Sequence, residues 1–96
     1  MAAYMVFNYR ITDQEAYKPY LGKVVGSLKA HGAEILVADF EGEAVEGDPG
    51  DVTVVLKCAS RDAAMGWFGS PEYQQIIGLR TDNCTGIAVL TNEAGG

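Results

Sequence analysis

Segments rich in β-branched and aromatic residues alternate along this chain with stretches of helical spacing, and their order is the strongest constraint on its fold. Such segments predict four main strands, at residues 3–11, 35–38, 52–58 and 83–91, with a short return strand at 44–46. Helical spacing predicts one helix that begins after Thr12 and ends at His31 and Gly32. A second, broken helical region is expected from Ser60 to about Arg80.

The order strand, helix, strand, strand, helix, strand is that of the ferredoxin-like α+β fold. We therefore expect one antiparallel sheet with the first and third main strands in its centre. Cys58 and Cys84 would lie on strands that the first strand separates, beyond the reach of a disulfide, so both are predicted to be free thiols. A length of 96 residues fits one domain, 1–96, in which 93–96 form a loose tail.

Capping side chains are predicted at three helix starts. Thr12 and Glu15 have the spacing of a capping box at the start of the first helix. Ser60 and Ser70 stand where a hydroxyl would accept hydrogen bonds from the first backbone N–H groups of the two later helices. Pro71 follows Ser70 at the first helical position, where proline is favoured.

Both faces of the predicted sheet carry apolar side chains, although the helices can cover only one face. In the first strand Met5, Phe7 and Tyr9 share one face, while Tyr4 and Val6 share the other. An apolar sheet face of this size usually marks an interface. A second copy of the chain, related by a two-fold axis, is the expected cover, and a monomer with a mildly apolar open face is the alternative.

Net charge excludes several classes of partner. The chain has 13 acidic and 7 basic residues, a formal net charge of −6, and the basic residues are scattered. Nucleic acids and anionic membranes attract clustered Lys and Arg, so neither is an expected partner. The first apolar run is interrupted by Asn8 and Arg10 and lacks a basic leader, so we expect a cytoplasmic protein with reduced thiols.

Four polar residues are candidates for chemistry, and each has a structural alternative. His31, the sole histidine, could act as a general acid or base, or bind the last carbonyls of the first helix. Arg10 could hold a substrate carboxylate, or form an ion pair. Asn8 could orient a ligand, or be a satisfied structural amide. Arg80, near a helix C-terminus, is expected to be a surface residue that complements the helix dipole.

Aromatic residues on the predicted helices could line a pocket between helices and sheet, or form plain core. Small-molecule sites are mostly apolar with a few polar groups, which these residues would supply. One histidine and two separated cysteines fall short of a metal-ligand set, and the glycines form no nucleotide-binding motif, so no metal or cofactor is expected. The candidate ligand-binding residues are Asn8, Tyr17, Tyr20, Trp67 and Tyr73, with Phe68 beside them.

Several short motifs together resemble the DUF1330 family. They are Thr-Asp-x-Glu-Ala-Tyr at 12–17, His-Gly at 31–32, Glu-Gly-Asp at 46–48 and Trp-Phe-x-Ser-Pro-Glu-Tyr-Gln at 67–74. The resemblance extends from about Tyr4 to Thr91. It implies a dimeric α+β barrel, in a superfamily that includes cofactor-independent monooxygenases and lactone isomerases. It implies no particular reaction and no catalytic set.

Two functions remain open at this point. The first is a homodimeric protein that binds a small organic molecule and could act on it as a cofactor-independent monooxygenase- or isomerase-like enzyme, with His31 and Arg10 as catalytic candidates. The second is a non-catalytic interaction module whose dimer is its functional form. A solvent-reachable pocket that contains at least one of His31, Asn8 and Arg10 would favour the first function.

Overall fold

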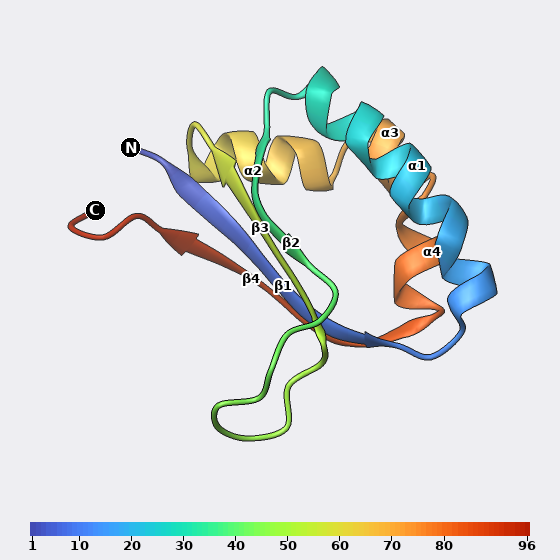
Figure 1. Ribbon diagram of the computed structural model, residues 1–96. Helices are drawn as coiled ribbons and strands as arrows, with labels where there is room; N and C mark the ends of the chain where they lie inside the picture. The colour runs from blue at the N-terminus through green and yellow to red at the C-terminus, as the bar shows by residue number, and fades with distance from the viewer.

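Four antiparallel strands form one sheet, and four helices lie together on one side of it (Figure 1). The computed structural model describes residues 1–96. The strands are β1 (Ala3–Ile11), β2 (Glu34–Asp39), β3 (Val52–Cys58) and β4 (Cys84–Asn92). The helices are α1 (Gln14–Ala30), α2 (Arg61–Phe68), α3 (Pro71–Gln74) and α4 (Ile77–Thr81). The ferredoxin-like α+β fold predicted from the order of elements is confirmed.

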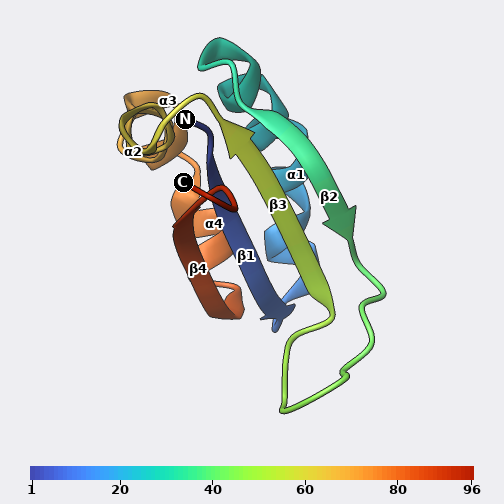
Figure 2. The ribbon, with the colours of Figure 1, turned by 90° about the vertical axis from the view of Figure 1, so that its left-hand side faces the viewer.

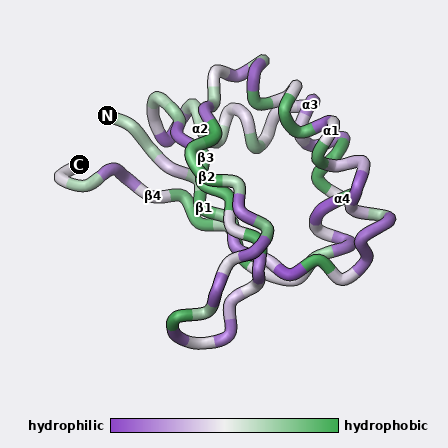
Figure 3. The backbone as a smooth tube through the Cα atoms, viewed as in Figure 1, coloured by the Kyte–Doolittle hydropathy of each residue, from purple (hydrophilic) through white to green (hydrophobic).

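The sheet has the strand order β2-β3-β1-β4, which places β1 and β3 in its centre as predicted (Figure 2). Met5 of β1 lies opposite Leu56 of β3 and Leu90 of β4, so one apolar row crosses the helix-facing side. Burial alternates along β1, where Met5, Phe7 and Tyr9 are buried and their neighbours are only partly covered. Hydrophobic segments accordingly follow the central strands (Figure 3).

The predicted return strand at 44–46 is wrong. Residues 40–51 form an open connection between β2 and β3, and Val45 within it is 93% exposed. The connection is fixed by a side chain instead of a strand partner. The Asn8 amide oxygen accepts a hydrogen bond from the Gly50 backbone N–H at 2.8 Å, and its nitrogen donates to the Gly50 carbonyl at 3.0 Å. This pairing ties the end of the connection to β1.

The helix caps agree with the sequence at two of three positions. Ser60 accepts a hydrogen bond from the Ala63 backbone N–H at 3.0 Å, and Ser70 accepts one from that of Tyr73 at 3.2 Å. At α1 the cap is Asp13, whose carboxylate accepts from the Ala16 backbone N–H at 3.1 Å. Thr12 does not cap the helix because its backbone N–H donates to the Asn83 carbonyl at 2.7 Å, which keeps it beside β4.

The two ends of the chain lie beside each other at one end of the sheet. The Glu93 backbone N–H donates to the Ala2 carbonyl at 3.2 Å, and the Glu93 carboxylate accepts from the Ala2 backbone N–H at 2.6 Å. Cys58 is buried and Cys84 half-buried, and both are free. No helix combines the length and the apolar character that crossing a bilayer requires.

Candidate functional site

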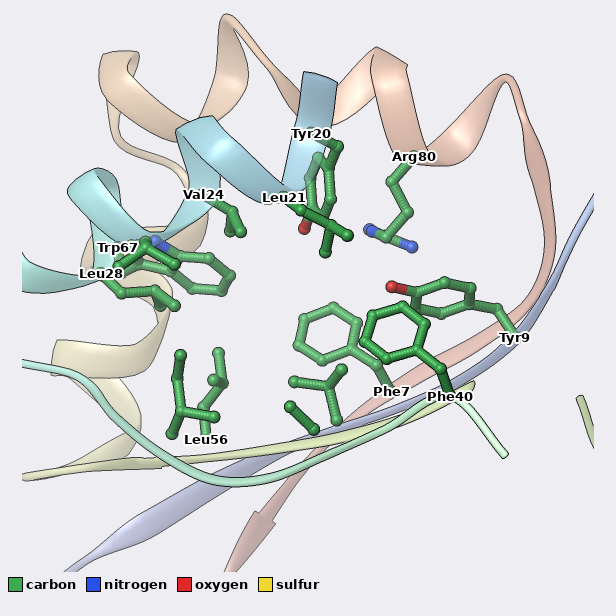
Figure 4. A pocket seen from close by; sticks show the side chains of 14 residues that line it. Phe7, Tyr9, Tyr20, Leu21, Val24, Leu28, Phe40, Leu56, Trp67 and Arg80 are labelled. Atoms are coloured by element: carbon green, nitrogen blue, oxygen red, sulfur yellow. The ribbon is translucent and has the colours of Figure 1, made fainter. Parts of the chain in front are cut away.

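A cavity of about 220 Å³ lies between α1 and the helix-facing side of the sheet (Figure 4). It exists because α1 packs against α3 and α4 and bridges over the strands. All of its lining residues except one are apolar or aromatic. They are Phe7, Tyr9, Tyr20, Leu21, Val24, Val25, Leu28, Ile35, Ala38, Phe40, Val54, Leu56, Trp67 and Arg80.

The cavity is reachable from solvent along the edge between α1 and β2. Leu21 and Val25 of α1 line it and are 42% and 40% exposed. On the other side of this edge Ile35 and Phe40 line it and are 43% and 38% exposed. Large apolar side chains at that exposure form an apolar mouth, through which an apolar molecule could enter without crossing a charged rim.

Trp67 forms the wall at one end of the cavity. It is 1% exposed, and its ring lies 4.2 Å from that of Tyr73 and 6.3 Å, edge to face, from that of Phe7. Its indole N–H donates to the Ser27 hydroxyl at 3.0 Å, which satisfies its single polar atom. The indole is therefore fixed, and it presents an apolar surface to the cavity.

Two pairs of tyrosine hydroxyls lie at the opposite end. The hydroxyls of Tyr9 and Tyr17 are 2.6 Å apart, and those of Tyr20 and Tyr73 are 2.8 Å apart. Burial, followed by interactions with neighbouring tyrosines, raises the pKa of Tyr9 and Tyr20 far above the ordinary value. Burial also raises the pKa of Tyr17 to about 12. These three hydroxyls are therefore protonated near neutral pH and can donate hydrogen bonds.

Arg80 is the one charged residue in the cavity wall, and its side chain is directed into the cavity (Figure 4). It is 9% exposed, and its Nε donates to the Tyr73 hydroxyl at 3.3 Å. Its guanidinium carbon lies 5.1 Å from the centre of the Phe7 ring and 5.9 Å from that of Tyr9. No acidic side chain pairs with it, since the ion pairs of the structure are Arg10 with Asp48 and His31 with Glu72.

The prediction that Arg80 is a surface residue is thus wrong. The α3–α4 region turns its inner side toward the sheet, and Tyr73 and Arg80 both lie on that side. A signal was present in the sequence, because the two residues are seven positions apart and positions seven apart share a helix face. Since Tyr73 was expected in a pocket, the same spacing would have placed Arg80 beside it.

The ligand-binding residues predicted from the sequence fall into two places. Tyr20 and Trp67 line the cavity, and Tyr17 and Tyr73 stand behind its wall, joined to it through their hydroxyls. Asn8 lies elsewhere, on β1 and pointing away from the cavity. Its amide makes hydrogen bonds to Gly50, Val52 and Thr53 that hold the 40–51 connection.

The two predicted catalytic residues are also outside the cavity. Arg10 lies at the end of β1 and binds the Asp48 carboxylate at 3.3 Å and the Pro49 carbonyl at 3.0 Å. His31 lies at the C-terminal end of α1, where its Nε2 is 3.3 Å from the Glu72 carboxylate. Hydrogen bonds from the Glu72 backbone N–H and from His31 lower the pKa of that carboxyl. No three His, Cys, Asp or Glu side chains gather closely enough to hold a metal ion.

A family model described as "Domain of unknown function (DUF1330)" matches residues 2–93. The chain belongs to the DUF1330 family. The family resemblance drawn from the motifs at 12–17, 31–32, 46–48 and 67–74 is confirmed. No curated protein matches this DUF1330 chain.

Solved structures show the same fold in proteins of low sequence identity. A protein of unknown function from Rhodopseudomonas palustris has a TM-score of 0.72 at 14% identity, over 92% of this chain and 80% of that one. A candidate antibiotic biosynthesis monooxygenase from Nitrosomonas europaea has a TM-score of 0.57 at 10% identity, over 94% of this chain and 88% of that one. At these identities the likeness concerns the fold alone.

Proposed function

We propose that this DUF1330 protein binds a small organic molecule in the cavity beneath α1. One observation carries the proposal: a solvent-reachable apolar cavity of about 220 Å³ that contains a single buried charged group, Arg80. An apolar cavity of roughly 150 Å³ is enough to hold benzene. The occupant is therefore a molecule of one ring or a compact pair of rings, smaller than a typical drug.

Turnover of the bound molecule without a cofactor is an extension of this proposal. The fold shared with a candidate monooxygenase supports it by analogy, which is a weaker argument than the geometry of the cavity. His31 and Arg10 do not line the cavity, so neither would contact an occupant. Any acid or base would come from the tyrosine hydroxyls and Arg80.

The protein is further proposed to be a homodimer through the open face of its sheet. Val37, Val55, Val6 and Val89 lie opposite one another in register, one from each strand, and form an apolar row across that face. A register shift between Ile35 and Val37 places Val37 opposite Val55, and so in this row. A row of this kind can meet its own copy across a two-fold axis.

A titration with a neutral probe tests the binding proposal. We expect indole, followed by ¹H–¹⁵N spectra, to shift the resonances of residues that line the cavity, such as Val24 and Leu28. A Val54→Phe variant fills part of the cavity and should weaken indole binding at least about fivefold, because the occupied volume is no longer available. Val45→Phe, on the exposed connection, is the matched control and should bind as the wild type does. Unchanged binding in Val54→Phe, or shifts only outside the cavity, would contradict the proposal.

A further inference from the structure

The charge of Arg80 is not balanced by any group of this chain. A buried charge is normally paired with an opposite charge, because leaving water costs it several kcal/mol. Here the guanidinium lies beside the Phe7 and Tyr9 rings and beside the hydroxyls of Tyr73 and Tyr20. Rings and a neutral hydroxyl offset part of that cost, since a cation over an aromatic ring gains about 0.5–2 kcal/mol. An anion beside the guanidinium would offset the rest.

The hydroxyl pairs leave two further donors without an acceptor. Each pair holds two O–H hydrogens, and the bond between its members uses one of them. Tyr73 also accepts from Arg80, so donation from Tyr73 to Tyr20 would leave the Tyr20 hydrogen free at the cavity wall. Donation from Tyr17 to Tyr9 would do the same for Tyr9, which also lines the cavity.

With the hydroxyls oriented in this way, this end of the cavity offers hydrogen-bond donors from three side chains to an occupant. Arg80 contributes its terminal N–H groups, and Tyr9 and Tyr20 contribute one hydroxyl each (Figure 4). Such a set matches a compact oxyanion, whose lone pairs accept several hydrogen bonds at once. The chains from Tyr17 through Tyr9 and from Tyr73 through Tyr20 would strengthen each bond to the anion by polarisation.

The other end of the cavity admits no second charge. Leu28, Leu56 and Trp67 form it, and the polar atom of Trp67 is already bonded to Ser27 (Figure 4). A second ionised or strongly polar group there would lose its hydration without gaining a partner. A dianion, a sugar or a nucleotide is excluded on this ground.

We propose that the ligand is a small organic monoanion, a carboxylate on an apolar ring, bound with its carboxylate at Arg80, Tyr9 and Tyr20 and its ring toward Trp67. This inference rests on the proposed function and specifies the class of molecule that the cavity takes. The charge of Arg80 favours an anion over a neutral molecule, and the hydroxyl donors beside it favour a group with several acceptor atoms. The apolar far end of the cavity disfavours a molecule that is polar throughout.

Matched pairs of probes test the charge requirement. Calorimetric titration at pH 7 would compare benzoate with benzamide and benzyl alcohol, and 1-naphthoate with 1-naphthamide. We expect each carboxylate to bind at least about tenfold more tightly than its neutral counterpart, since hydrogen bonds to an ionised group are worth about 1.5–3 kcal/mol. Arg80→Gln should abolish this preference and leave the affinity for the neutral probes within about twofold. Arg10→Gln, on the other side of the sheet, is the control and should preserve the preference.

A second variant keeps the charge requirement testable if Arg80→Gln does not fold. Tyr20→Phe removes one donor and keeps the ring, so carboxylate affinity should fall about three- to tenfold while neutral probes bind as before. Equal affinity of benzoate and benzamide for the wild type would overturn the anion inference and leave the binding proposal intact. Absence of binding by every probe, indole included, would overturn both.

Discussion

Arg80 brings a positive charge into an apolar cavity, and in the ligand-free protein that charge costs stability. Replacing a buried unpaired charge by an apolar side chain of similar length is expected to stabilise the fold. We predict that Arg80→Met raises the free energy of unfolding of the ligand-free protein by about 1 kcal/mol, measured by urea denaturation. Arg61→Met, at an exposed position where the guanidinium binds Asn92, should change it by less than about 0.5 kcal/mol. A loss of stability in Arg80→Met would mean that Arg80 is a structural residue.

The buried tyrosines predict a loss of stability at alkaline pH. The pKa of Tyr17 is raised from 10.0 to about 12 in the folded protein, so the unfolded chain releases this proton first. The stabilisation is complete below pH 10 and is lost as pH rises toward 12. Urea unfolding between pH 9 and pH 11.5 should show a steep decline in the free energy of unfolding. The decline should be shallower in Tyr17→Phe. It should be unchanged in the control Tyr4→Phe, which alters a half-buried tyrosine with no partner hydroxyl. Equal slopes in the wild type and both variants would refute the assignment of this loss of stability to Tyr17.

At the scale of single residues, the sequence predicts the positions of the aromatic side chains well and those of the charged side chains poorly. Tyr20 and Trp67 line the cavity because each lies on the apolar face of its helix, which periodicity reveals. The place of Arg80 near a helix C-terminus predicts a surface residue, whereas its seven-residue spacing from Tyr73 indicates the side that faces the sheet. Asn8 depends on a contact with Gly50, 42 positions later, which sequence spacing cannot show.

At the scale of elements, strands were predictable where both their residues and their partners favour them. β1 and β3 carry alternating or continuous β-branched and aromatic residues and pair in register along their length. The segment 44–46 has one apolar pair between glutamates, and no strand lies beside it. The connection that contains this segment is instead held at Gly50 by the amide of Asn8, a distant contact that local propensity does not reveal.

Gly86 is the position in β4 where the sheet depends on the absence of a side chain. It lies opposite Tyr9 in the β1–β4 ladder, and a Cβ there would come within 2.6 Å of the Tyr9 Cα and Cβ atoms. We predict that Gly86→Ala separates the two strands, displaces Tyr9 and lowers the free energy of unfolding by about 2–4 kcal/mol. Gly22→Ala, in α1 with open space around the added methyl, should instead raise it by about 0.5–1 kcal/mol. Thermal denaturation of the two variants measures these changes. An unchanged free energy of unfolding in Gly86→Ala would contradict the close approach of β4 to Tyr9.

At the scale of the whole molecule, the two faces of the sheet differ in what covers their apolar residues. The helix-facing side forms the core and the cavity, and the chain itself covers its apolar residues except at the mouth of the cavity. The open face exposes Ile87 and Val89 at 62% and 44%, more than a sheet in water usually does. The valine row on this face is the reason to expect a second copy there, because a symmetric contact needs only one patch.

Light scattering on a size-exclusion column tests this arrangement. We predict twice the chain mass at micromolar concentration for the wild type, and the mass of one chain for Val6→Lys, which places a charge in the centre of the valine row. The monomeric variant should remain folded, since a lysine stem can lie along the open face and reach water with its amine. Val45→Lys, at the tip of the 40–51 connection, is the matched control and should leave the dimer intact. If wild type and Val6→Lys had the same mass, the valine row would not be the interface. If Val6→Lys were monomeric and still bound indole, the cavity of a single chain would be sufficient for binding.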